Sequence, residues 1–81
     1  MKAFYFTFGS THPLRDFAQK VVTSDKDKAM ACMFAFYGKK WSYCFGPYEF
    51  DGIDDHQTSV TLLGSIQFRL IPHTIYDREV I

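Results

Sequence analysis

Residues 2–8 have the sequence KAFYFTF, and this stretch decides the fold. Phe4, Phe6 and Phe8 occupy alternate positions, so an extended chain places their rings on one side. Such a period of two is typical of a half-buried β-strand. Residues 9–13 contain one glycine and one proline, which interrupt regular pairing and predict a turn. The N-terminal segment therefore predicts the first strand of a sheet with an aromatic core.

The chain beyond this turn predicts a second strand and then a helix. Residues 14–22 carry scattered apolar side chains and favour an antiparallel return strand. A Ser24 hydroxyl is suited to cap a helix, and residues 28–37 contain neither glycine nor proline. Gly38 provides a stop signal at the other end. We expect one helix to follow the first two strands.

Two further strands are predicted after the helix. Residues 41–45 alternate aromatic and small side chains, which indicates a strand with one aromatic face that ends at Gly46-Pro47. Residues 48–59 are polar and acidic and are predicted to form a loop. Residues 65–70 alternate again, and Pro72 is expected to end that strand. We expect the tail, residues 73–81, to fray or to dock on a groove.

Together these elements predict an α+β fold of the ββαββ type. It consists of an antiparallel sheet of three to four strands with one helix packed on it, and residues 1–81 form a single domain. No internal repeat, linker or second domain is indicated. The chain is 47% hydrophobic and 19% aromatic, a composition that predicts a folded core rather than disorder.

Composition and charge also limit the partners. The formal net charge is zero, which removes the general attraction to phosphates that supplies most non-specific nucleic-acid affinity. No apolar run approaches the length of a membrane span. Cys32 and Cys44 are too few for a disulfide framework, and no secretory signal precedes them, so we expect reduced thiols. We therefore expect neither direct nucleic-acid binding nor a membrane role.

The residue types that could support catalysis lack the spacing that it needs. Cys44 with a histidine such as His12 could form a thiolate–imidazole pair, and Asp54-Asp55 is a pair of carboxylates. Neither belongs to a recognisable motif, and no metal-ligand spacing such as Cys-x-x-Cys is present. We predict no catalytic residue, no metal and no cofactor. A small metal-dependent enzyme built on these residues is retained as an alternative.

An acidic and aromatic segment is the candidate for partner binding. Four carboxylates occur within a span that has no lysine or arginine, and two rings accompany them. Carboxylates speed encounter with a basic surface, and rings supply anchoring area. The ordinary alternative is a solvated loop. The predicted partner-binding residues are Tyr48, Glu49, Phe50, Asp51, Asp54 and Asp55.

The predicted helix is apolar almost all round. A helix that rests on a sheet needs only one apolar stripe, yet Cys32, Ala35 and Phe36 lie away from the main stripe. We predict that these three residues contact another subunit or the C-terminal segment. A structural homodimer is therefore a second functional alternative.

Two stretches of the chain resemble a group of small uncharacterised proteins encoded by bacteriophages and prophages. The first is Phe4–Gly9 (FYFTFG) followed by His12-Pro13-Leu14, and the second is Ala29–Phe34 leading into Tyr37–Trp41 (YGKKW). In that group a strand ends in Phe-Thr-Phe-Gly with a histidine nearby, and a helix closes in Phe-Gly-x-Lys-Trp. Tyr37 here stands where phenylalanine is more usual, and the chain beyond Tyr48 does not share the resemblance.

The resemblance implies a viral accessory protein that acts in the cytoplasm of an infected bacterium. Phages carry many short proteins that bind and disable host machinery or immune complexes, and CRISPR inhibitors are one example. We therefore expect a non-enzymatic protein that binds and inhibits a host protein or defence complex.

Overall fold

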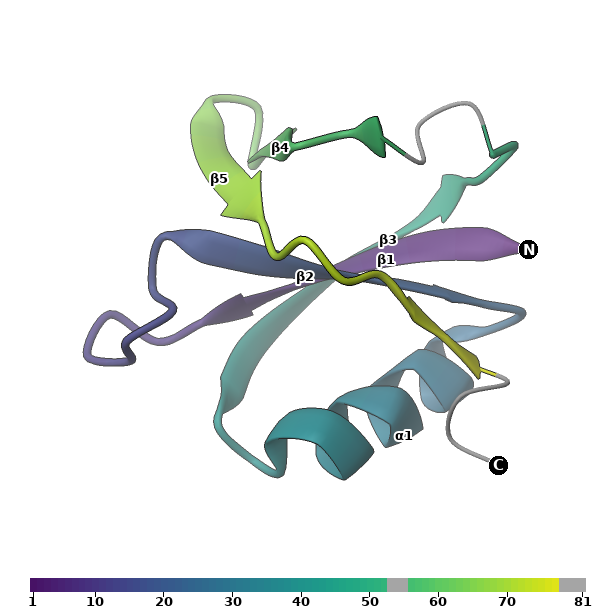
Figure 1. Cartoon of the computed structure of the whole chain (residues 1–81), viewed down its shortest axis with the longest axis horizontal. Coiled ribbons are helices and arrows are strands. Elements are labelled where there is room, and N and C mark those ends of the chain that lie inside the picture. The colour runs from purple at the N-terminus through teal and green to yellow at the C-terminus, as the bar shows by residue number, and fades with distance from the viewer. Residues whose placement is uncertain (53–55, 78–81) are drawn as a thin grey trace.

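Within the part of the chain that the structure describes, six strands and one helix follow one another (Figure 1). The computed structural model describes residues 1–52 and 56–77. The elements in chain order are β1 (Lys2–Phe8), β2 (Phe17–Thr23), α1 (Lys26–Tyr37), β3 (Trp41–Glu49), β4 (Ser59–Leu62), β5 (Ile66–Leu70) and β6 (Ile75–Tyr76).

The strands form one mixed sheet in the order β3-β1-β2-β5-β4, and β6 also pairs with β2. β1 is antiparallel to both β2 and β3, and β4 is antiparallel to β5. β5 and β6 run parallel to β2 and occupy successive stretches of its edge. Because α1 connects β2 to β3, the chain crosses over β1 and places β3 at the far edge of the sheet.

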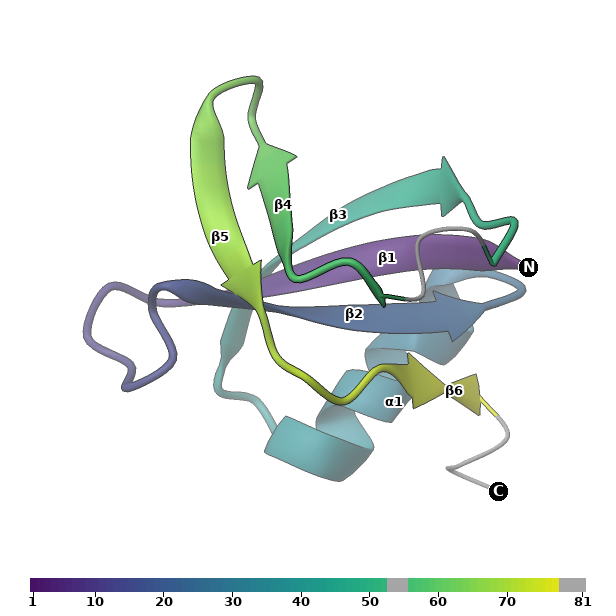
Figure 2. The same ribbon diagram turned by 45° about the horizontal axis from the view of Figure 1, so that its top comes forward.

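The central strands are buried on both faces. On one face Phe4 and Phe6 pack with Met33 of α1. On the other face Tyr5 packs with Leu70, which belongs to the hairpin formed by β4 and β5. Figure 2 shows the hairpin and α1 on opposite sides of β1 and β2. The alternation in β1 therefore separates two cores rather than a core from solvent.

The α+β class with one packed helix is confirmed, whereas the predicted ββαββ sheet is too small. The sheet has more than four strands and is mixed, not purely antiparallel. Period-two alternation identifies a strand but carries no information on its direction, and the parallel pairs join segments about 50 residues apart. The helix also begins one residue later than a Ser24 cap would place it, because the Asp25 carboxylate, and not Ser24, accepts the Lys28 backbone N–H at 2.9 Å.

β3 does not end at Gly46-Pro47, as predicted, but continues through it to Glu49. The Gly46-Pro47 bond is cis, and the pairing register with β1 shifts there and again near Ser42. Gly46 has a φ of 133°, and a Cβ at this position would lie 2.9 Å from the Ala3 carbonyl oxygen. Only glycine therefore fits this close approach of β3 to β1 without strain.

The shift near Ser42 divides the aromatic residues of β3 between the two faces. Trp41 pairs with Phe8 and lies on the helix side, where its ring contacts Phe6 at a centroid distance of 5.1 Å. Tyr43 pairs with Thr7 and lies on the hairpin side. The predicted single aromatic face is therefore wrong, because one extra residue in a strand reverses the side to which later residues point.

The tail contains an ordered anchor. Ile75 in β6 is completely buried against the helix-side core, so this part of the tail docks on the domain, which is the second of the two alternatives expected for it. Residues 78–81 of that prediction lie outside the described residues.

Candidate functional site

An aromatic row runs along the hairpin side of β3. Tyr43 and Phe45 stack with a centroid distance of 5.8 Å and an interplanar angle of 29°. Tyr48 follows on the same side, because Phe45 pairs with Tyr5 and Tyr48 pairs with Ala3. Tyr43 and Tyr48 remain 66% and 47% exposed, although both lie on an otherwise well-packed sheet. Large exposed rings on a rigid element are typical of interaction surfaces.

Buried residues support this row from below. The Tyr5 ring contacts Tyr48 at 5.7 Å, and its hydroxyl donates a hydrogen bond of 3.1 Å to Oε1 of Gln57. Tyr5 itself is buried, because the hairpin covers this face of β1. The exposed ring of Tyr48 therefore rests on a side chain that packing and a hydrogen bond both hold in place.

Phe50 anchors the segment that leaves β3. Its ring is half-buried against the hairpin-side core, and the Lys20 ammonium group lies 4.8 Å above the ring centroid. Lys20 is itself buried on β2. A cation over a desolvated ring contributes about 1–2 kcal/mol. Of the predicted partner-binding residues, Phe50 therefore holds the segment to the domain, while its neighbours remain accessible.

Carboxylates follow the aromatic row directly. Glu49 is exposed at the end of β3 opposite Lys2, and Asp51 is exposed two residues later. Asp54 and Asp55 lie outside the described residues, although the chain carries both. We refer to Tyr43, Phe45, Tyr48, Glu49 and Asp51 as the β3 surface.

The residues predicted for self-association are divided between the core and the surface. Cys32 is buried with the phenylalanines of β1, so it cannot contact another subunit without unfolding. Ala35 and Phe36 are exposed, and the Phe36 ring lies 6.4 Å from the ring of His73. The C-terminal segment thus reaches part of this helix face. Self-association through Ala35 and Phe36 stays a prediction.

The residues of the enzyme alternative occupy structural positions. His12 lies in the turn after β1, where its ring contacts Phe8 at 4.8 Å and its Nδ1 accepts the Leu14 backbone N–H at 3.0 Å. Cys44 packs against the helix-side core, and burial raises the pKa of its thiol, an effect that Lys26 partly opposes. A raised pKa leaves less of the reactive thiolate at neutral pH. Among the described residues, no group of three or more His, Cys, Asp or Glu side chains could hold a metal ion.

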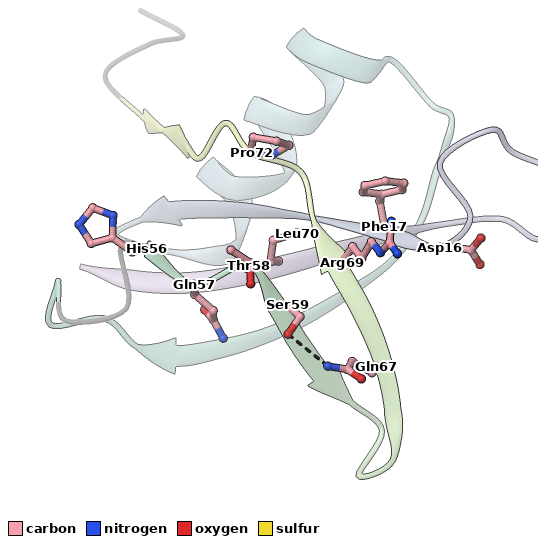
Figure 3. Close-up of a pocket in the computed structure, with 10 residues that line it drawn as sticks. All are labelled: Asp16, Phe17, His56, Gln57, Thr58, Ser59, Gln67, Arg69, Leu70 and Pro72. Carbon is pink, nitrogen blue, oxygen red and sulfur yellow. Dashed lines mark hydrogen bonds between the residues drawn. The ribbon is translucent and has the colours of Figure 1, made fainter.

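A second feature is an open hollow of about 1040 Å³ on the outer face of the hairpin (Figure 3). The Gln67 amide donates to the Ser59 hydroxyl at 3.2 Å, and the Arg69 backbone N–H donates to the Asp16 carbonyl at 3.1 Å. Figure 3 shows His56 at the opposite end of the hollow from Asp16. The side chains around it offer scattered hydrogen-bonding groups rather than a converging set.

No local signal in the sequence indicates this hollow or the position of Tyr43 and Phe45 on the hairpin side of β3. The alternation of Gln67 and Arg69 with apolar residues indicates a polar outer face, but not which segment it meets. Residues 41–45 predict a single aromatic face, because the shift near Ser42 that separates Tyr43 and Phe45 from Trp41 leaves no local signal in the sequence.

The chain matches no protein-family model, and neither a curated protein nor a solved structure matches it. Within the part of the chain that the structure describes, no helix has the length and apolarity needed to cross a membrane. The contacts and exposures given above are therefore the basis for a functional proposal.

Proposed function

We propose that this protein is a non-enzymatic binding protein that occupies a basic surface of another protein through the β3 surface. The observation that carries the proposal is the position of two exposed tyrosines beside exposed carboxylates on one supported strand. The sequence resemblance to small phage proteins supports a host protein or defence complex, such as a CRISPR complex, as the target, and the host cytoplasm as the location.

The tyrosines provide binding energy at low entropic cost. A tyrosine has few rotatable bonds and buries a large area, and such rings are enriched at the energetic centres of interfaces. Tyr48 is held against Tyr5, and Tyr43 is stacked on Phe45. Because their neighbours already restrict these rings, less side-chain freedom is lost on binding.

The carboxylates provide direction and selectivity. Glu49 and Asp51 are exposed in a stretch that also contains Asp54 and Asp55 and has no lysine or arginine. Charges at the rim of an interface mainly accelerate association with an oppositely charged surface, and salt screens this effect. A nucleic-acid-binding channel of a host protein has the required positive charge, whereas nucleic acid itself would be repelled at this end of the row.

Affinity capture from a nuclease-treated bacterial lysate tests the proposal. The tagged wild-type chain is compared with Glu49→Lys/Asp51→Lys and with Tyr43→Ser/Tyr48→Ser. We expect one or more basic proteins to be retained by the wild type and lost from both double variants. We also expect their retention to fall as salt rises from 0.1 to 0.5 M, where the Debye length drops below about 5 Å.

Matched controls separate the β3 surface from general effects. Asp16→Lys/Asp27→Lys makes the same change in net charge at two exposed positions outside this surface, and Phe36→Ser removes an exposed ring from α1. Both controls should retain the captured protein. Equal loss in the controls, or retention by Glu49→Lys/Asp51→Lys, would contradict the proposal.

A further inference from the structure

We infer that the segment bound by the β3 surface is a proline-rich stretch with a lysine or arginine at one end. This inference rests on the proposed function and adds the conformation of the partner segment to it. It follows from the spacing of the rings, the interrupted edge of β3 and the position of the carboxylates.

The edge of β3 is poorly suited to adding another strand. The pairing of β3 with β1 shifts near Ser42 and again at Gly46-Pro47, so no long, regular ladder remains along the strand. Pro47 also lacks an N–H donor. Bulges and prolines of this kind protect strand edges against pairing with another chain. A partner must therefore contact the side chains of β3 rather than its backbone.

The side chains match an extended helix of the polyproline II type. Tyr43 and Tyr48 pair with Thr7 and Ala3, which lie four residues apart on β1, so the two tyrosines are about 13 Å apart along the sheet. A polyproline II segment rises about 3.1 Å per residue, so about four residues would cover the row. Such segments have no internal hydrogen bonds and dock on aromatic side chains. A tyrosine hydroxyl can in addition donate to the free carbonyl groups of such a backbone.

The charges determine what flanks the prolines. Glu49 and Asp51 follow Tyr48 immediately, so a ligand that covers the row places one of its ends next to these carboxylates. An arginine there would form charge-assisted hydrogen bonds with a carboxylate. Single-stranded nucleic acid also stacks on exposed rings, but it needs a basic groove along its backbone. The described charges thus favour a cationic peptide over an oligonucleotide.

Fluorescence polarisation with labelled peptides tests this inference. The probes are a peptide of three Pro-Pro-Ala repeats with two arginines at its C-terminal end, and a second peptide with the arginines at its N-terminal end. We expect saturable binding of at least one of them to the full-length chain. Tyr48→Ser and Glu49→Lys/Asp51→Lys should each weaken binding by about tenfold or more, as removal of an interface anchor does. Gln67→Ala, on the outer face of the hairpin, should change it less than about twofold.

Three outcomes would overturn the inference. These are the absence of saturable binding, equal binding of a peptide in which alanine replaces every proline, and tighter binding of a ten-nucleotide oligothymidylate than of either peptide. Circular dichroism of each variant checks that the fold is intact. If the peptides fail while a lysate protein is still captured through the β3 surface, only the inference is wrong. If the peptides bind but no lysate protein is captured, the preference of the β3 surface for such peptides is supported and the proposed binding of a host protein fails.

Discussion

Replacement of Gly46 by alanine should destabilise the protein more than the same change at any glycine that faces open space. Gly46 has a φ of 133°, and an added Cβ would meet the Ala3 carbonyl oxygen at 2.9 Å and the Phe4 side chain at 3.2 Å. The conformation alone costs a residue with a side chain about 1–3 kcal/mol. The overlap with backbone atoms, which have little room to move, adds about 1–3 kcal/mol.

The expected loss is therefore about 2–6 kcal/mol, out of a total stability of about 4–12 kcal/mol for a chain of this length. Two other glycines separate the contributions. Gly64 has a φ of 78° but no atom within 4 Å of its added Cβ, so Gly64→Ala should cost only the conformational part. At Gly9 the space is open and φ is not in the positive range, so Gly9→Ala should change stability by less than about 0.5 kcal/mol.

Urea denaturation followed by circular dichroism measures all three variants. The urea midpoints should decrease in the order Gly9→Ala, Gly64→Ala, Gly46→Ala. The free energy of unfolding of Gly46→Ala should be at least about 1 kcal/mol lower than that of Gly64→Ala. Equal midpoints for Gly46→Ala and Gly64→Ala would refute the close approach of β3 to β1. That approach also sets the register of Tyr48, so the result bears on the β3 surface.

Three further predictions concern single side chains. Tyr37→Phe removes the hydrogen bond of 2.8 Å to Oε1 of the buried Gln19 and should cost about 1–3 kcal/mol in urea denaturation; no loss would show that Oε1 has another partner. Leu63 is exposed with a φ of 54°, so Leu63→Asn should raise stability by about 0.5–1 kcal/mol; an unchanged midpoint would contradict strain at this turn. Burial raises the pKa of the Cys44 thiol above its usual 9.0, because the folded protein favours the neutral thiol. The contribution of this thiol to the free energy of unfolding is therefore fully present below pH 9 and is lost as pH rises through the raised pKa. The urea midpoint of Cys44→Ala should therefore decline less steeply with pH above pH 9 than that of the wild type. Equal declines in the two proteins would contradict a raised pKa at Cys44.

The sequence predicts well the elements whose signals are local. The alternating phenylalanines of β1 identify a strand with the correct bounds and one correct core face. The apolar run before Gly38 identifies a helix that ends where predicted, because glycine adopts the positive φ of 65° at its end. Such features depend on neighbouring residues alone.

Features that depend on distant segments were not predictable. Tyr5 is buried only because residues 59–70 fold back over β1, and the parallel pairing of β5 with β2 has no local signal. Gly46-Pro47 usually indicates the end of a strand, yet here β3 continues through it and approaches β1 closely, which only the tertiary structure reveals.

The candidate site was predicted in part for the same reason. Tyr48, Glu49 and Asp51 were identified from composition, and all three are exposed. Phe50 was identified as well, but its contact with the buried Lys20 makes it an anchor of the segment. Tyr43 is not among the predicted partner-binding residues, because the side of the sheet on which it lies depends on the register shift near Ser42.

Hydrogen–deuterium exchange of the chain, alone and with the protein that it captures from lysate, tests most directly whether the β3 surface is the binding site. Binding there should slow exchange within residues 43–51 and leave residues 66–70, beside the hollow of Figure 3, unchanged. Slowed exchange confined to α1 or to the hairpin, with residues 43–51 unaffected, would contradict the account.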